Sequence, residues 1–554
     1  MTDLLVHGGR VHVGDGKSAE ALLARDGRVV ATGAARELGR QAPGAERVDL
    51  RGGLLVPGWT DAHVHFLWWS IQRSRIDLRD AETLDAALER IGAYARRLPP
   101  DAWILGGRFD KNRWGRWPTA GELDRVSDGR PAVLQSRDGH SMWLNTKALE
   151  IAGITRTTES AEGGRIERSA DGSPSGILLE NAKWLASAVV PPPTGDENLE
   201  ALRRGQREAW ARGVTGVEDL EESAAYEAWR RLHDAGELGL RVAMGIPYRT
   251  LATHEDARRI TSVDRAPGLG DVFRSGATAP RHDFETALAT GLRTGDGDEW
   301  LRIGHLKIFT DGALGSQTAA LEEPYEGSDD RGILTIDPAD LDRDVARAAA
   351  AGLAVAIHAI GDRAVRVALD AIEPTRRTHP ALRQRVEHLQ LLREADIRRF
   401  GALGVIASMQ PIHATSDRDL ADRYWGERRT PRAYPWRSLL AAGARLAFGS
   451  DAPVEPIDPL LGIHAAVARK RPGDATPWHA EQALTLDESL AAYSAGAGYA
   501  VGGEAELGTF APGMRFDATA VDRDLAALPP EEWLGTRVIA TIVGGVVRFA
   551  DGAG

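Results

Sequence analysis

The sequence predicts an α/β protein built around a (β/α)8 barrel, and three observations support this prediction. Eight short apolar runs follow one another along residues 54–453, and several are almost continuously apolar, as parallel strands covered on both faces are. Segments of helix-forming composition separate the runs, and several of these segments end in glycine, which commonly stops a helix. The chain of 554 residues is long enough for a barrel together with further units.

The predicted barrel strands lie in the runs LLVPGWTDAHVHF, VTGVEDL, LRVAMGIP, LRIGHLKIFTDG, LAVAIHAI, RVEHLQLL, GVIASMQP and ARLAFGSDAP. Runs of this kind that alternate with helical segments are typical of repeated βα units, in which consecutive strands are parallel. We therefore assign residues 57–66 and 205–504 to the barrel.

The two ends of the chain resemble each other in pattern. Residues 1–56 contain short strand-like runs separated by GDG and DG turn signals, and residues 505–554 repeat this style. We predict that both ends pair in one composite β-sandwich domain, and two unrelated β tails are the alternative.

The stretch between the first and second predicted strands is far longer than an ordinary βα connection. It is rich in tryptophan and arginine and closes on the proline run VVPPPTG. We predict that residues 67–204 form an inserted cap domain that contributes to substrate binding.

Composition and charge exclude several classes of protein. The net charge of −12 and the pI near 5.7 speak against a nucleic-acid partner, which would require a basic face. With no cysteine, the chain has no disulfide, no thiolate metal ligand and no cysteine nucleophile. No run approaches the roughly 20 apolar residues of a membrane span, and no cationic leader precedes an apolar run. We expect a cytoplasmic protein without a membrane partner.

Potential metal ligands recur where the predicted strands end. His63 and His65 are two residues apart, so on a strand they share a face, although an HxH pair alone is a weak signal. His358, His388 and Asp451 each follow another apolar run and precede a turn. Because the carboxyl ends of barrel strands meet at one mouth, we expect these side chains to converge there on a divalent metal.

Lys307 lies at the same strand-end level and is one of only six lysines among 68 basic residues. A strand lysine can simply extend its amine to the surface. A buried ammonium facing metal cations would be repelled, however, whereas the neutral amine can react with carbon dioxide to form an anionic carbamate. The sequence therefore makes Lys307 a candidate ligand.

The motifs GWTDAHVHF, HLKIFTDGALGS, AIHAIGD, VEHLQ and FGSDAPVEP resemble those of the metal-dependent amidohydrolase superfamily. More narrowly, the chain resembles amidohydrolase family 3, the branch that includes N-substituted formamide deformylase, and the resemblance covers essentially the whole sequence. It implies one or two divalent ions per chain, with zinc favoured, and a homodimer. The implied ligands are His63, His65 and Asp451 for one ion and His358 and His388 for the other, bridged by carboxylated Lys307. A mononuclear site with unmodified Lys307 is the alternative.

We expect a metal-dependent hydrolase that cleaves an amide, formamide or cyclic amide bond of a small organic substrate through a metal-activated water. Asp451 is the candidate general base and proton carrier, or else a ligand only. No Ser-His-Asp or Cys-His arrangement is evident. The alternatives are a deaminase, isomerase or decarboxylase of the same fold, or a non-catalytic scaffold, which the complete ligand set disfavours.

Five further residues are candidates for substrate binding or for support of the site. His140 and Trp143 occur in DGHSMW, and Glu180 occurs in GILLENA. Gln410 and His413 follow the seventh predicted strand in SMQPIH. His305 shares a face with Lys307 but lies deeper, so we expect it in the core.

Overall fold

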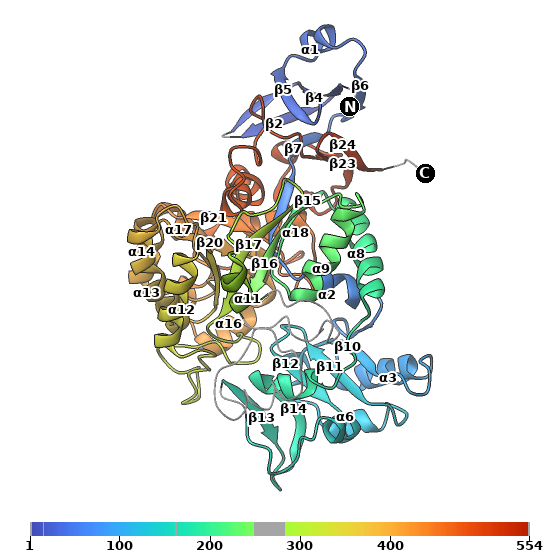
Figure 1. Ribbon diagram of the computed structural model, residues 1–554, viewed down its shortest axis with the longest axis vertical. Helices are drawn as coiled ribbons and strands as arrows, with labels where there is room; N and C mark the ends of the chain where they lie inside the picture. Colours follow the sequence, from blue (N-terminus) through green and yellow to red (C-terminus); the bar gives the residue numbers. More distant parts are fainter. Residues whose placement is uncertain (1–2, 15, 161–162, 249–282, 552–554) are drawn as a thin grey trace.

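The computed structural model describes residues 3–14, 16–160, 163–248 and 283–551. At its centre, eight parallel strands form one sheet in the order β21-β20-β19-β18-β17-β16-β15-β8 (Figure 1). Their bounds are β8 (Trp59–Val64), β15 (Val214–Asp219), β16 (Arg241–Pro247), β17 (Leu301–Phe309), β18 (Val355–Ala359), β19 (Arg385–His388), β20 (Ile406–Met409) and β21 (Arg445–Phe448). Each of the eight predicted runs supplies one of these strands, so the predicted fold class is confirmed.

Backbone hydrogen bonds connect the first and last strands of this sheet. The N–H of Asp451, just after β21, donates to the carbonyl of His63 at 2.7 Å. The N–H of His65, just after β8, donates to the carbonyl of Ala452 at 2.9 Å. These bonds nearly close the barrel, and they bring Asp451 beside His63 and His65.

Helices lie between consecutive strands and cover the outside of the barrel: α9 (Ser223–Asp234), α12 (Pro338–Ala350), α13 (Asp362–Thr378), α14 (Glu394–Leu403) and α17 (Trp436–Ala441). Local sequence explains where some helices begin. In α12, the side chain of Asp337 accepts a hydrogen bond from the N–H of Ala339, and Pro338 occupies the first turn, where its missing N–H is harmless. At α8 (Gly195–Trp210), which precedes β15, Thr194 and Glu197 form a capping box.

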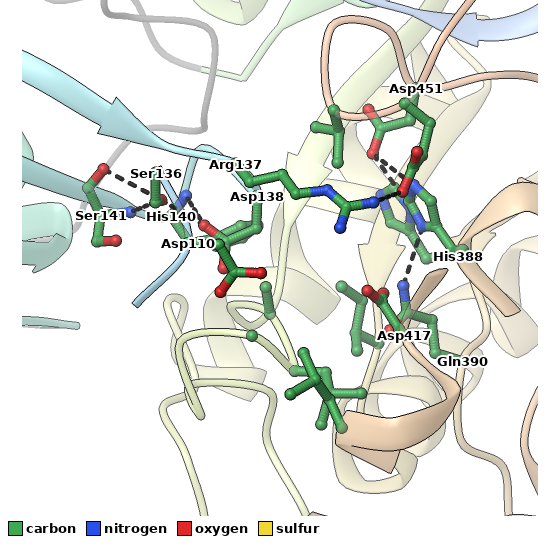
Figure 2. Close-up of a pocket in the computed structure, with 18 of the residues that line it drawn as sticks. Asp110, Ser136, Arg137, Asp138, His140, Ser141, His388, Gln390, Asp417 and Asp451 are labelled. Atoms are coloured by element: carbon green, nitrogen blue, oxygen red, sulfur yellow. Dashed lines mark hydrogen bonds and ion pairs between the residues drawn. The ribbon is translucent and has the colours of Figure 1, made fainter. Parts of the chain in front are cut away.

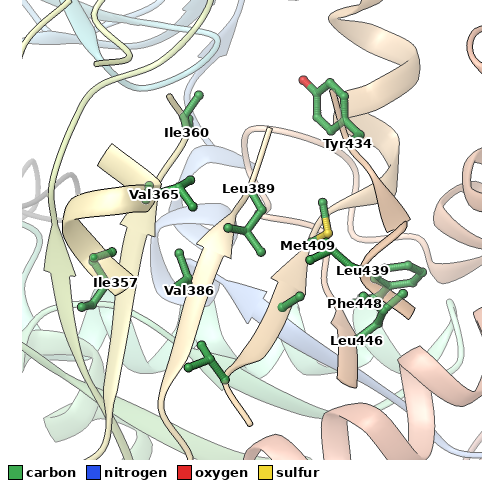
Figure 3. Close-up of a cluster of buried hydrophobic side chains, with 14 of the residues drawn as sticks. Ile357, Ile360, Val365, Val386, Leu389, Met409, Tyr434, Leu439, Leu446 and Phe448 are labelled. Atoms are coloured by element: carbon green, nitrogen blue, oxygen red, sulfur yellow. The ribbon is translucent and has the colours of Figure 1, made fainter. Parts of the chain in front are cut away.

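The core between sheet and helices follows the two-residue period of the strands. Ile357 of β18, Val386 of β19 and Phe448 of β21 are fully buried in one hydrophobic cluster. Figure 3 shows them on the same side as Val365 of α13 and Leu439 of α17. Their neighbours in sequence point into the barrel, so the interior receives the polar residues of the same strands.

A six-stranded mixed sheet occupies the long connection between β8 and β15. Its order is β13-β14-β12-β11-β10-β9, with bounds β9 (Ile76–Asp77), β10 (Ile104–Phe109), β11 (Ala132–Ser136), β12 (Ser141–Leu144), β13 (Gly164–Arg168) and β14 (Pro174–Glu180). Helix α3 (Leu84–Ala95) packs its apolar side chains in the same cluster as this sheet. Figure 1 shows the sheet at the end of the barrel opposite the two chain ends.

The two chain ends share a sheet. The six-stranded sheet β24-β23-β22-β7-β2-β3 combines β2 (Arg10–Gly14), β3 (Lys17–Ala19) and β7 (Leu54–Pro57) with β22 (Ala518–Val521), β23 (Val538–Val543) and β24 (Val546–Ala550). Strand β7 pairs antiparallel with β22, so the ends are joined directly. A second sheet, β5-β4-β1-β6, contains β1 (Leu4–His7), β4 (Ala21–Arg25), β5 (Arg28–Gly33) and β6 (Glu46–Asp49). The domain boundaries given above stay predictions.

Among the described residues, no helix has both the length and the apolar character that a membrane crossing requires.

Candidate active site

The structure brings the six predicted metal-site residues together at the carboxyl ends of the barrel strands. All six are buried: His63, His65, Lys307, His358, His388 and Asp451. His63 Nε2 lies 3.4 Å from Asp451 Oδ1, and His65 Nε2 lies 3.5 Å from the same oxygen. One donor atom each of His63, His388 and Asp451 lies within 4.8 Å of the other two.

A local backbone conformation helps to form this cluster. His388 follows Val386 by two residues, so regular strand geometry would turn both side chains towards the helices. The φ of His388 is 72°, and that of Asp451 is 59°, which are left-handed values that residues other than glycine adopt at some cost. His388 thereby leaves the strand pattern, and its Nδ1 lies 3.9 Å from Asp451 Oδ2.

The histidines are oriented by partners behind them. His63 Nδ1 lies 2.6 Å from Glu387 Oε2, and because the Glu387 carboxylate is an acceptor, Nδ1–H donates and the Nε2 lone pair faces the cluster. His358 Nε2 lies 3.1 Å from the carbonyl of Gly312, which likewise leaves Nδ1 as the lone-pair nitrogen. That buried Nδ1 has no hydrogen-bond partner among the described residues.

The protonation states of the clustered side chains also favour binding of a cation. Burial lowers the pKa of His65 to about 4 and lowers the pKa values of His358 and His388, so these imidazoles are neutral near pH 7. Burial alone would raise the pKa of Asp451, but the nearby His63 and His65 hold it well below its ordinary value. The Nε2 atoms of His63 and His65 lie 3.4 Å and 3.5 Å from one oxygen of Asp451, and buried imidazoles beside a carboxylate form a donor set that fits a divalent metal.

Lys307 is only 3% exposed, and its Nζ lies 3.3 Å from His63 Nε2. The ring centre of Phe309 lies 4.7 Å from the same nitrogen. Burial lowers the pKa of Lys307 to about 8, so a fraction of the amine is neutral near pH 7.

A buried chain of charges, which no local sequence signal predicts, supports His63 from inside the barrel. Arg385 forms hydrogen bonds to both Glu387 and Glu218. Glu218 in turn lies 2.5 Å from Nδ1 of His305, which is fully buried as expected. Arg385 and Glu387 are two residues apart in RVEH, so the two-residue strand period predicts that both side chains point into the barrel. The period does not predict that Glu387 lies beside His63.

A pocket with an open volume of about 750 Å³ lies between the metal-site cluster and the inserted sheet. Figure 2 shows Asp110, Arg137, Asp138 and His140 of the inserted segment facing His388, Asp417 and Asp451 of the barrel. Arg137 forms an ion pair with Glu455, which belongs to the segment after β21. Its concave lining, which combines apolar side chains with a few converging polar groups, suits a small organic molecule.

The five predicted substrate-site residues take different positions. His140 and His413 line the pocket. Glu180 lies behind His140, with Oε2 at 2.9 Å from the ring Nδ1. Gln410 lies behind His388, with Oε1 at 2.8 Å from Nδ1. These two residues therefore orient histidines and do not line the pocket.

Trp143 is not brought to the pocket. It is fully buried, and its ring packs against Phe109 and Trp114, with centres 5.9 Å and 6.1 Å away. Its Nε1–H donates to the carbonyl of Thr119 at 2.8 Å. Ser141, two residues earlier on β12, lines the pocket, so Trp143 continues the same face into the core next to α3.

Comparison with known proteins identifies the family. The model of the amidohydrolase family matches residues 46–549. The chain belongs to this family. Putative amidohydrolase YtcJ of Bacillus subtilis (strain 168) is 29% identical over 98% of each chain. N-substituted formamide deformylase of Arthrobacter pascens is 30% identical, over 99% of this chain and 98% of its own.

A solved structure supports the same conclusion. The crystal structure of an uncharacterized metal-dependent hydrolase from Pyrococcus horikoshii OT3 aligns with a TM-score of 0.71 and 26% identity, covering 96% of this chain and 98% of that one. The predicted family is thus confirmed. This amidohydrolase is an enzyme, a hydrolase acting on carbon–nitrogen bonds.

Proposed function

We propose that this amidohydrolase cleaves the C–N bond of a small amide, formamide or cyclic amide in the pocket between the barrel and the inserted sheet. The observation that carries the proposal is the cluster of His63, His388 and Asp451, buried where that pocket meets the strand ends. The name of the Arthrobacter pascens relative makes N-substituted formamides the first substrates to test.

The donor set supports zinc as the resident metal, because the converging ligands are imidazole and carboxylate, which zinc commonly takes in catalytic sites. His63, His65 and Asp451 would hold one ion, and His358 and His388 would hold a second, with Lys307 between them. Such an ion supplies a Lewis acid for the substrate carbonyl and a water that is activated near neutral pH.

Asp451 transfers the proton in this mechanism. Its carboxylate is ionised because its pKa lies well below the ordinary value, and it lines the pocket, so it can take a proton from the attacking water. The water oxygen forms a bond to the carbonyl carbon, the C–N bond then breaks, and Asp451 returns the proton to the departing nitrogen.

His140 positions the substrate from the opposite wall. Glu180 accepts a hydrogen bond from Nδ1–H of His140, so Nε2 of His140 is the ring nitrogen available to bind substrate in the pocket. Thr318 donates to the other oxygen of Glu180 at 2.5 Å, so the carboxylate that orients His140 is itself held in place.

Lys307 acts as a carbamate in this proposal. The neutral amine forms a bond to the carbon of CO2 and loses one proton, giving an anion between the two groups of ligands. Its burial and its pKa of about 8 support this reaction. Unmodified Lys307 beside a single ion is the alternative. A homodimer, a cytoplasmic location and the absence of nucleic-acid or membrane partners stay predictions.

Metal analysis combined with a substrate screen tests the proposed function. The purified protein is analysed for bound metals and assayed with formamides, linear amides and lactams by following amine or acid release. We expect turnover of at least one class, loss of turnover with a chelator, and recovery with Zn²⁺. A fully metal-loaded protein that hydrolyses none of them would contradict the proposal, and turnover of a decarboxylase or isomerase substrate would replace it.

A further inference from the structure

A second cavity lies beside the active-site pocket and is lined by arginines. It is bounded by the end of α2 (Phe66–Gln72), by β9 and β10, and by the segment that follows Asp451. Five arginines line it, together with only two acidic residues, Asp77 and Glu455. The arginines are Arg73, Arg75, Arg79, Arg108 and Arg212. In a chain with a net charge of −12, this is a marked local excess of positive charge.

One acidic residue of the lining pairs with one of its arginines, and the other pairs with an arginine outside the lining. Asp77 accepts a hydrogen bond from Arg79 Nε at 2.8 Å. Glu455 forms an ion pair with Arg137 on the active-site side, and it accepts a hydrogen bond from Ser416 Oγ at 2.6 Å. Asp77 thus offsets Arg79, whereas Glu455 offsets an arginine outside the lining, so these two carboxylates balance only part of the positive charge of the five lining arginines.

Glu208 compensates part of this charge at the rim. It lies outside the lining, with its carboxylate 3.0 Å from Arg73 and 3.8 Å from Arg212. Among the carboxylates of the lining, Asp77 is the one that interacts with both Arg79 and Arg108.

The positive charge of Arg108 is the least compensated by nearby carboxylates. Its side chain is 7% exposed, and Nη2 donates to the carbonyl of Val454 at 3.0 Å. Its buried Nε has no hydrogen-bond partner, and no carboxylate lies within 4.0 Å of the guanidinium, among the described residues. Burial lowers the pKa of Arg108 to about 9, and the positive charges of Arg79 and Arg137 act in the same direction. Burying an unpaired cation is unfavourable, so a counter-anion in the cavity would stabilise it.

The backbone at Arg108 is also unusual. The register between β10 and β11 shifts between Gly107 and Phe109, so Arg108 occupies a β-bulge. Its φ is 66°, a left-handed value that a residue with a side chain adopts at some cost. Bulges of this kind redirect a side chain, and here the redirected side chain lines the arginine cavity.

We propose that this cavity binds a phosphate group, either as the free ion or as part of a small phosphorylated molecule. Guanidinium groups present two parallel N–H donors that match pairs of phosphate oxygens, and several around one cavity can surround a tetrahedral dianion. A dianion also balances more of the excess charge than a monocarboxylate does. Because Glu455 lines both cavities, the bound anion lies one side chain away from the active-site pocket.

Calorimetric titration of the full-length, metal-loaded protein tests this inference. Inorganic phosphate is titrated against a chloride solution of equal ionic strength, followed by glycerol phosphate and succinate. We expect saturable binding of one phosphate per chain and weaker binding of succinate. If glycerol phosphate binds more tightly than inorganic phosphate, the ligand is a phosphorylated molecule. If it binds equally or more weakly, the ligand is the free phosphate ion. No saturable binding, or binding of succinate alone, would overturn the proposal.

Substitutions locate the site and separate it from the metal centre. Arg108→Gln and Arg79→Gln should each weaken phosphate binding by about tenfold or more, as expected for loss of a charge-assisted hydrogen bond. Arg79 is partly exposed, so its substitution remains informative if the Arg108 variant does not fold. Arg398→Gln on α14, where the side chain is 80% exposed, makes the same change in net charge and should leave binding unchanged.

A crystal soaked in selenate gives an independent location. Its anomalous signal should lie among the arginines of the cavity. Binding that is unchanged in both arginine variants, or an anomalous peak in the active-site pocket alone, would assign the anion to the metal centre and refute the second site.

Discussion

The two walls of the active-site pocket differ in composition and in origin. The barrel wall carries buried imidazoles around Asp451, near or just beyond the ends of the strands. The wall of the inserted segment carries charged residues, including Asp110, Lys111 and Arg137. We infer from this difference that the barrel supplies the reaction chemistry, whereas the insertion selects what is bound. Substitutions on the barrel wall should therefore reduce kcat or metal affinity, and those on the insertion wall should change KM.

Asp451→Asn should have the largest effect. The amide cannot accept the proton from water, so we expect kcat to fall by roughly 10³-fold or more, while the fold is retained. Activity, metal content and circular dichroism are measured on the same preparation. A metal-loaded, folded variant with normal kcat would remove Asp451 as the proton carrier.

Lys307→Ala should reduce kcat by about 10²-fold, because the bridging anion between the ligand groups is lost. Added acetate or propionate should restore part of the activity by occupying the space of the carbamate. The matched comparison is wild-type enzyme with the same acids, which should show no gain. A variant as active as wild type without any additive would contradict the carbamate.

Glu387→Gln should weaken metal binding by about 10- to 100-fold, as loss of a carboxylate behind a metal-binding histidine typically does. The neutral amide holds His63 Nδ1 less strongly and leaves Arg385 with Glu218 as its remaining carboxylate. Competition with a chromogenic chelator measures the affinity. Glu394→Gln on the surface of α14 is the control, since its side chain is 70% exposed. Equal affinities in the two variants would show that Glu387 does not support the ligand.

Carbamate formation in the metal-free protein should depend on pH through Lys307. Only the neutral amine reacts, and its pKa is lowered to about 8. At fixed dissolved CO2 the rate should rise roughly tenfold per pH unit up to pH 8 and level off above it. Carbon-13 NMR with labelled bicarbonate measures the carbamate signal. A rate that still rises steeply above pH 9 would show that the amine titrates near its ordinary value.

Arg137→Gln should have the smallest effect. The substitution removes the positive charge of the insertion wall that pairs with Glu455. We therefore expect KM to rise about 3- to 10-fold, while kcat stays within a factor of two of the wild-type value. Arg156→Gln, at an exposed position on the insertion, is the control for net charge. A drop in kcat without a change in KM would show that the insertion takes part in the reaction step.

Sequence patterns predicted the barrel wall well because each signal there is local. An apolar run followed by a turn marks the carboxyl end of a strand, and all six candidate ligands lie near such an end, either in the last residues of the strand or just after it. The rule works less well for the insertion. Trp143 and Ser141 share a face of β12, yet only Ser141 reaches the pocket, because the position of α3 decides where the core begins.

The sequence by itself determined the strand order, the family and the set of side chains at the strand ends. These follow from the two-residue strand period and from short motifs. Only the tertiary structure decided that Glu387 holds His63, that Arg137 reaches Glu455, and that five arginines surround one cavity. Such contacts join segments far apart in the chain, and no periodicity in either segment encodes which partner the other will meet.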